Sequence, residues 1–237
     1  MLEALPLTLS GWCRFARQMG VCMKGRMGLT CWLTGLLLIM AACASPAAEA
    51  GCGGVETVGA KRKVNPGGHA PLAIGDSTML LALPNLARAG YRVNARGCRG
   101  WSEGMAVLRA EKRSRRLPHL VLMALGADWS VSLRSIRRTL HLLGPRRVLA
   151  LMTPLELGGW AGDDARSMRR AFKRYPQRIV LLDWVRYSRG HGEWFQPDGT
   201  HLTFSGADAF ARLARRATPW AKHGEMPNRT FFPKADS

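Results

Sequence analysis

The stretch PLAIGDSTML, residues 71–80, joins an apolar run to a polar turn and then to a second apolar segment. Its first five residues have the composition of a buried strand, and the residues after the turn are compatible with a helix. Asp76 and Ser77 lie in the turn, where Gly-Asp-Ser is also ordinary turn chemistry. In an open sheet of parallel strands, ligands bind at the carboxyl ends of the strands. Ser77 is therefore a candidate functional residue if such a sheet surrounds it.

Apolar runs of similar length recur further along the chain, and segments with helical spacing separate them. The predicted strands are residues 71–75, 91–95, 120–126, 147–154 and 178–184. Near-continuous apolar strands that alternate with helices are typical of a parallel sheet covered on both faces. The sequence therefore predicts an α/β domain with a five-stranded parallel sheet.

The N-terminal part of the chain has the features of a secretory signal. Residues 28–42 form an apolar run that follows basic residues and precedes small ones. The run is shorter than the about 20 residues that a membrane-spanning helix needs. Cleavage is expected before Cys43, as in a lipoprotein, or after Ala44 or Ala50, and a retained N-terminal anchor is the alternative. Each version places the rest of the chain outside the cytoplasm, with membrane contact only through the N-terminal segment.

Composition divides the chain into four segments. Residues 1–50 are the N-terminal extension with the signal or anchor, and the glycine-rich residues 51–70 are expected to form a flexible linker. Residues 71–216 form the α/β domain, which is long enough for one well-buried core. Residues 217–237 are expected to form a loosely ordered tail.

The chain is strongly basic, with 35 Lys and Arg against 16 Asp and Glu and a formal net charge of +19. In an exported protein the anionic partners are envelope polymers or lipid headgroups, so nucleic acid is not an expected partner. The basic residues are scattered, as on solvated helix faces. The sequence has no glycine-rich phosphate loop, and its histidines have no metal-ligand spacing, so neither a cofactor nor a metal is predicted.

The cysteines agree with export. Four of the six lie in or before the predicted leader, which leaves Cys52 and Cys98 as a pair. In an oxidising compartment a single disulfide between them is the natural hypothesis, and two free thiols are the alternative.

A second polar motif, DGTH, follows the last predicted strand. Asp198 and His201 are three residues apart, and Gly199 between them permits a turn that brings both side chains to one side. An aspartate that accepts from one imidazole nitrogen fixes the tautomer and leaves the other nitrogen to act on a serine such as Ser77. A surface turn followed by a helix cap is the alternative interpretation.

These motifs together resemble the SGNH (GDSL-type) hydrolase family, and most closely its exported acyl-esterase and acyltransferase domains. The first block is IGDSTML (74–80), and the last is DGTHLTFSG (198–206), where the family typically reads Asp-Gly-x-His-Leu. The resemblance spans roughly residues 70–216. It implies a flavodoxin-like three-layer α/β/α sandwich. It also implies Ser77 as nucleophile, His201 as general base and Asp198 as its orienting partner.

The two middle blocks depart from the family pattern. In the second block, VNARGCRG (93–100), the family glycine aligns near Cys98. In the third block, VLMALGADW (121–129), Asp128 stands at the family asparagine. The resemblance implies an oxyanion hole formed by the Ser77 N–H, a backbone N–H near Cys98 and the third-block side chain. A carboxylate repels an oxyanion unless it is protonated, so Asp128 either has a raised pKa or turns away to cap the helix beginning near Ser130.

The sequence thus predicts hydrolysis or transfer of an acyl ester through an acyl-enzyme on Ser77. The expected substrates are acyl esters of envelope glycans or lipids, and a membrane acyltransferase is a candidate partner. The alternative is a catalytically weakened domain that binds envelope glycan or a partner acyltransferase, and Asp128 is the feature that favours it.

Overall fold

The computed structural model describes residues 52–156, 158–159 and 161–227. The predicted secretory signal, with Cys43, Ala44 and Ala50, lies outside the described residues. Within the described ranges, no helix is both long and apolar enough to cross a membrane.

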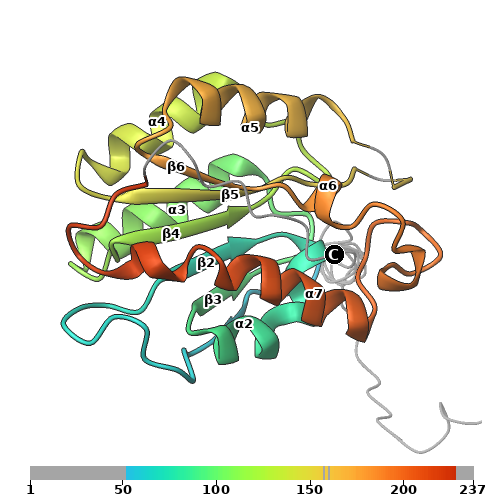
Figure 1. The fold of residues 1–237 in the computed structure, drawn as a ribbon, viewed down its shortest axis with the longest axis horizontal. Coiled ribbons are helices and arrows are strands. Elements are labelled where there is room, and N and C mark those ends of the chain that lie inside the picture. Colours follow the sequence, from blue (N-terminus) through green and yellow to red (C-terminus); the bar gives the residue numbers. More distant parts are fainter. Residues whose placement is uncertain (1–51, 157, 160, 228–237) are drawn as a thin grey trace, which may run out of the picture. The chain divides into compact units, whose positions relative to one another are not determined.

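A six-stranded sheet forms the centre of the domain, with the strand order β1-β3-β2-β4-β5-β6 (Figure 1). Its strands are β1 Glu56–Val58, β2 Leu72–Gly75, β3 Arg92–Ala95, β4 Leu120–Ala124, β5 Val148–Met152 and β6 Ile179–Leu182. Strands β2 to β6 pair in parallel, and β1 pairs antiparallel with β3 at the edge. The prediction of five parallel strands is confirmed.

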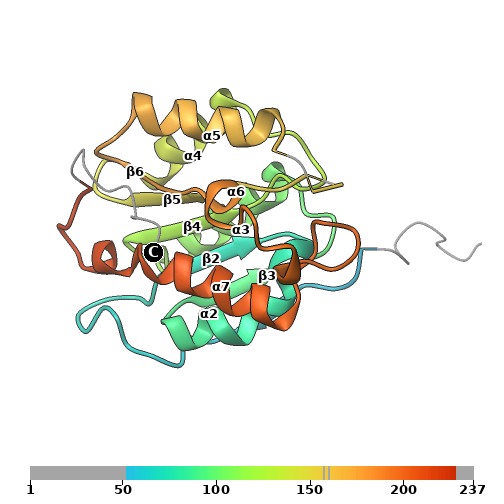
Figure 2. The same ribbon diagram turned by 45° about the vertical axis from the view of Figure 1, so that its right-hand side comes forward.

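Helices cover both faces of the sheet. The α-helices are α2 Leu83–Ala89, α3 Trp101–Arg113, α4 Leu133–Leu143, α5 Asp163–Arg174, α6 Trp184–Tyr187 and α7 Phe204–Arg215. Three short 3₁₀ helices are η1 Ser77–Ala82, η2 Gly192–Trp194 and η3 Thr218–Ala221. Helices α4 and α5 lie over one face, and α2 and α7 lie side by side under the other (Figures 1 and 2).

The strand sequences explain why both faces are covered. Successive side chains of a strand point to opposite faces, and the central strands are apolar at every position. On one face Ala73 and Leu122 pack with α2 and α7, and on the other Ile74 and Met123 pack with α3, α4 and α5. Two separate buried clusters result, which is the three-layer sandwich expected from the resemblance.

Strand β1 lies within residues 51–70, for which the sequence analysis predicts a flexible linker. Its three residues are largely exposed and lack apolar periodicity, so no sequence signal marks a strand there. They are ordered by pairing with the edge of β3, and Lys61 N–H also donates to the carbonyl of Ala87. The start of the predicted loose tail is ordered as well, because Trp220 of η3 is buried against the core.

The strand order reverses next to β2, and this decides where a site forms. The chain passes from β2 to β3 on one side and then crosses to β4 on the other side. In such sheets the loops that leave the carboxyl ends of the two neighbouring strands diverge and open a crevice. The loop after β2 begins with Asp76 and Ser77, and the loop after β4 contains Asp128.

Candidate active site

Ser77 is the first residue of η1, directly after the tip of β2. Asp76 caps this helix, because its side chain accepts a hydrogen bond from the backbone N–H of Thr78. Gly75 lies against Met79, and a Cβ at this glycine would come within 2.7 Å of the Met79 side chain. The local sequence therefore turns the chain sharply and leaves the half-buried Ser77 side chain at the crevice.

The structure brings Ser77, His201 and Asp198 into one hydrogen-bonded line. The Nε2 atom of His201 lies 3.0 Å from the Ser77 Oγ, although the residues are 124 positions apart. The other ring nitrogen, Nδ1, lies 2.6 Å from Oδ2 of Asp198. With Nδ1 protonated towards the carboxylate, Nε2 carries the free lone pair and can accept the serine proton.

The turn that holds Asp198 and His201 is fixed by its own backbone. Gly199 has a φ of 71°, which favours glycine, and the N–H of Gln196 donates to the carbonyl of His201 at 2.8 Å. The second carboxylate oxygen of Asp198 accepts the backbone N–H groups of Thr200 and His201, both at 2.9 Å. Both carboxylate oxygens of Asp198 are therefore held in place.

These contacts also set the ionisation of Asp198. Partial burial acts to raise the pKa of its carboxyl, but the hydrogen bonds from Thr200 and His201 outweigh this and lower the pKa to about 2. Asp198 therefore remains a carboxylate at neutral and mildly acidic pH, with its negative charge beside Nδ1 of His201.

Known proteins resemble this chain in sequence over about 60% of its length. No profile of a known protein family matches the chain. Over 144 residues it is 28% identical to peptidoglycan O-acetyltransferase OatA of Listeria monocytogenes, a match that covers 60% of this chain and 23% of that protein. The chain thus spans under a quarter of the length of this curated relative.

Two solved structures resemble the fold. The C-terminal catalytic domain of Streptococcus pneumoniae OatA superposes with a TM-score of 0.56 at 21% identity, covering 65% of this chain and 94% of the domain. An acetyl-xylooligosaccharide esterase from Geobacillus gives 0.50 at 15% identity, covering 70% and 99%. The chain has the fold of an SGNH hydrolase.

In this fold, Asp76 connects the turn that holds Ser77 to the loop after β4. Its buried carboxylate accepts N–H groups from Gly126 at 3.1 Å and Ala127 at 3.3 Å. The other oxygen accepts the N–H and hydroxyl of Thr78. Burial raises the pKa of the Asp76 carboxyl, while the hydrogen bonds from Thr78 and Ala127 oppose that rise. Asp76 thus fixes the loop after β4 relative to Ser77.

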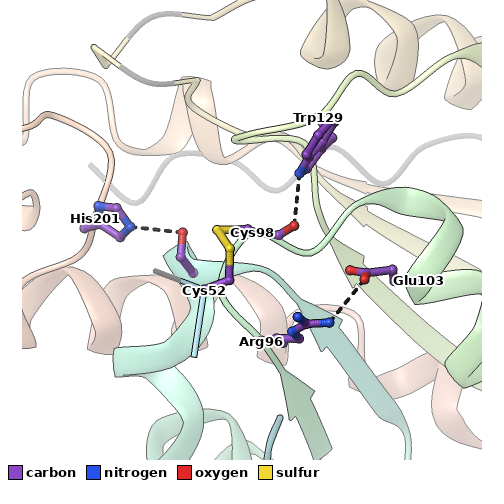
Figure 3. Close-up of a disulfide and its surroundings, with 7 residues drawn as sticks. Cys52, Arg96, Cys98, Glu103, Trp129 and His201 are labelled. Atoms are coloured by element: carbon purple, nitrogen blue, oxygen red, sulfur yellow. Dashed lines mark hydrogen bonds and ion pairs between the residues drawn. A yellow bond between two sulfur atoms is a disulfide. The ribbon is translucent and has the colours of Figure 1, made fainter. Parts of the chain in front are cut away.

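A disulfide joins Cys98 of the second block to Cys52 near the start of the described chain (Figure 3). Cys98 has a φ of 52°, a conformation that favours glycine, and the resemblance described above aligns a glycine near this position. Its carbonyl accepts the indole N–H of Trp129 at 3.0 Å. The disulfide and this hydrogen bond hold a non-glycine residue in a turn that it would otherwise rarely adopt.

Asp128 lies in the bend after β4 and is exposed. Its negative charge acts to raise the pKa of nearby Asp76. It does not cap the following helix, because α4 begins at Leu133 and the hydroxyl of Ser132 accepts the N–H of Ser135 as the cap. The alternative in which Asp128 caps a helix that begins near Ser130 is therefore wrong, because Ser132 supplies a side-chain oxygen directly at the helix start.

Three residues beside the site were not predicted from the sequence. Asp76 has the signature of an ordinary turn residue, and neither Arg99 nor Trp129 forms a recognisable motif of its own. Arg99 is buried and donates to the carbonyls of Gly75 and Asn94, at 3.2 and 2.7 Å. The signal that could have found it is an arginine directly after the turn of the second block. Among the residues that the structure describes, no group of side chains is suited to bind a metal ion.

Proposed function

We propose that this protein is an exported serine esterase or O-acyltransferase that acts on acyl esters of an envelope glycan or lipid. The single observation that carries the proposal is the position of His201 between Ser77 and Asp198, at 3.0 and 2.6 Å. Serine is a weak nucleophile without a base in hydrogen-bond reach, and this arrangement supplies both the base and its orienting carboxylate.

The first half of the proposed reaction forms an acyl-enzyme. Ser77 Oγ attacks the ester carbonyl carbon while its proton moves to Nε2 of His201. The tetrahedral oxyanion accepts hydrogen bonds from backbone N–H groups of the first two blocks. The intermediate then collapses, the ester C–O bond breaks, and the departing alcohol takes the proton from Nε2.

The second half returns Ser77 to its starting state. Water or a glycan hydroxyl gives its proton to Nε2 and attacks the acyl carbon, and Ser77 leaves with that proton. Attack by water completes hydrolysis, and attack by a sugar hydroxyl completes transfer. The sequence relative named as a peptidoglycan O-acetyltransferase supports a glycan as donor or acceptor.

Export is part of the proposal. The N-terminal sequence supports a secretory signal or a lipid anchor at Cys43. The Cys52–Cys98 disulfide supports the same compartment, since disulfides persist where the surroundings are oxidising. A membrane acyltransferase that delivers the acyl group is a proposed partner.

The proposal is tested with the purified full-length chain and nitrophenyl acetate. We expect nitrophenol release by the wild type, loss of this release in Ser77→Ala, and acetylation of a chitooligosaccharide in the same mixture if transfer occurs. Release that is unchanged in Ser77→Ala contradicts a Ser77 acyl-enzyme.

A second candidate function is favoured by Asp128. Its carboxylate stands at the third-block position where an oxyanion donor is expected, and removing one donor costs on the order of 100- to 1000-fold in rate. A catalytically weakened domain that binds glycan or a partner acyltransferase is the resulting alternative. Absence of turnover in both the wild type and Asp128→Asn supports it.

A further inference from the structure

A cavity of about 520 Å³ lies on the α3–α4 side of the second block. Its lining residues are Cys98, Gly100, Trp101, Ser102, Glu103, Met105, Arg109, Trp129, Ser130, Ser135 and Arg138. None of the side chains in the Ser77–His201–Asp198 line belongs to this lining. The cavity is thus a separate hollow that shares the Cys98 loop with the candidate active site.

The floor of the cavity is rigid. Trp101 and Met105 of α3 are buried there, and both contact Thr139 of α4, which is fully buried. The indole N–H of Trp101 donates to the Thr139 hydroxyl at 3.0 Å, and that hydroxyl lies 3.0 Å from the Met105 sulfur. Because these contacts join the two helices, the space between them is preformed and needs no rearrangement on binding.

An exposed tryptophan forms the rim nearest the second block. Trp129 is 60% exposed, although large aromatic side chains are usually buried. Its ring lies against Gly100, where an added Cβ would be 3.6 Å from the ring, and its N–H is bonded to Cys98. The indole is therefore held in place while more than half of it is exposed to solvent. An exposed aromatic ring in a fixed position suits a ligand with one apolar and one polar side, as a pyranose ring has.

Two unpaired guanidinium groups supply charge to the same cavity. Arg109 extends from α3 and Arg138 from α4, and both are exposed. Neither makes an ion pair or hydrogen bond within the described part of the chain, whereas the lining carboxylate of Glu103 is already paired with Arg96 at 3.2 Å (Figure 3). Arginine forks match carboxylate and phosphate groups in geometry as well as in charge.

The cavity is also close to the proposed chemistry. Figure 3 shows His201 on one side of the Cys52–Cys98 disulfide and Trp129 on the other. Cys98 belongs to the second block of the candidate active site and to the cavity lining at once. A chain of sugars that reached from Trp129 to the Ser77–His201 pair would pass Cys98.

We infer that this cavity is a glycan subsite that selects a sugar bearing an anionic group, which Arg109 and Arg138 bind while the ring stacks on Trp129. The hydroxyls of Ser102 and Ser130 also line the cavity and can bond to the sugar hydroxyls. The inference rests on the proposed function, because that function requires the glycan to run from this cavity towards Ser77. It narrows the class of substrate to anionic glycans. The charged group is a carboxylate or a phosphate.

The test measures binding in full-length Ser77→Ala, so that turnover plays no part. The probes share one ring: N-acetylglucosamine is neutral, N-acetylmuramic acid adds a carboxylate, and N-acetylglucosamine 6-phosphate adds a phosphate. We expect one or both anionic sugars to bind about tenfold more tightly than the neutral sugar by calorimetry, as charge-assisted hydrogen bonds are stronger than neutral ones. The tighter of the two identifies the charged group.

Variants locate the effect. The double variant Arg109→Gln with Arg138→Gln is expected to remove the preference for the anionic sugars. Trp129→Phe keeps an aromatic ring and both arginines, so it is expected to keep the preference. The matched control is Arg134→Gln with Arg137→Gln, which also removes two charges, from exposed positions of α4 outside the cavity lining, and is expected to change nothing. Equal affinity for all three sugars, or a preference that survives the double substitution, overturns the inference.

A further measurement does not depend on the variants. Raising the salt concentration to 1 M is expected to weaken binding of the anionic sugars and leave the neutral sugar unaffected, because salt screens exposed charges. Salt-independent binding of the anionic sugars contradicts the subsite. Absence of nitrophenyl acetate hydrolysis by the wild type would overturn the proposed function but not the subsite, because the binding experiment does not depend on hydrolysis.

Discussion

The carboxylate of Asp76 accepts the backbone N–H of Gly126 at 3.1 Å, across 50 positions of sequence. This hydrogen bond joins the loop after β2, which begins with Asp76 and Ser77, to the loop after β4, which holds Asp128. The two loops leave neighbouring strands at the point where the sheet reverses its order. A buried side chain therefore fixes the distance between two parts of the proposed oxyanion hole.

Asp76→Asn is expected to destabilise the fold by about 1 to 3 kcal/mol, because an amide has one acceptor oxygen where the carboxylate has two. Either the Thr78 donors or the N–H groups of Gly126 and Ala127 are then left facing an NH₂ group. Urea unfolding measures the change. Asp163→Asn is the control, because Asp163 is 83% exposed at its side chain and pairs with Arg166 at the surface. Equal effects of the two substitutions would show that Asp76 does not brace the loops.

The disulfide is expected to stabilise both the fold and the second block. Cys52 and Cys98 are 46 positions apart, and closing a loop of that length stabilises the native state by at most roughly 4 kcal/mol. Cys52→Ser with Cys98→Ser should therefore lower the urea midpoint, and it should also lower kcat for nitrophenyl acetate.

A second double variant separates the two roles of Cys98. Cys52→Ser with Cys98→Gly also lacks the disulfide, but glycine adopts the positive φ of this turn without strain. We expect it to retain more kcat than the Cys98→Ser version. If both double variants lose activity equally, the conformation of residue 98 is not what the disulfide preserves.

Asp198 makes stability depend on pH in a defined direction. Its pKa is about 2 in the folded protein and 3.8 ordinarily, so the ionised group stabilises the fold above pH 3.8. That contribution disappears as the pH falls towards 2. The difference in thermal midpoint between the wild type and Asp198→Asn should therefore be present at pH 6 and vanish near pH 2. A difference that is the same at both pH values contradicts this account.

The same substitution tests the orientation of His201. Without the carboxylate, the imidazole has no partner that keeps its proton on Nδ1, and kcat for nitrophenyl acetate should fall on the order of 10⁴-fold. A small effect on kcat would mean that Asp198 serves the turn and not the base.

Asp128→Asn is expected to increase kcat by about tenfold or more, since it replaces a repelling carboxylate with an amide that can donate to the oxyanion. Asp163→Asn removes the same charge from an exposed position at the start of α5 and should leave kcat unchanged. A decrease in kcat on Asp128→Asn would show that the carboxylate itself takes part in the reaction of this protein.

The sheet was predictable from the sequence because its strands are buried on both faces. Continuous apolar runs such as residues 120–124 and 148–152 have no other favourable environment in a chain of this composition. Strand β1 was not predictable, since its exposed residues are ordered by pairing with β3 and not by their own pattern. The start of the tail was missed for a similar reason, because Trp220 is buried only through tertiary packing.

The candidate site was predictable where local motifs determine it. Gly199 with its positive φ makes the DGTH turn almost a local property, and the strand tip sets the position of Ser77. The connections over long sequence separations were not predictable. Neither the hydrogen bond of Trp129 to Cys98 nor that of Asp76 to Gly126 leaves a signal in either segment alone.

The most direct test of the central claim is the mass of the full-length chain after reaction with a fluorophosphonate, followed by peptide mapping. An activated serine nucleophile is expected to take up one phosphonyl group, located on Ser77, and His201→Ala is expected to abolish the labelling because the base is lost. Absence of an adduct, or an adduct on another serine, would contradict the assignment of Ser77 as the nucleophile.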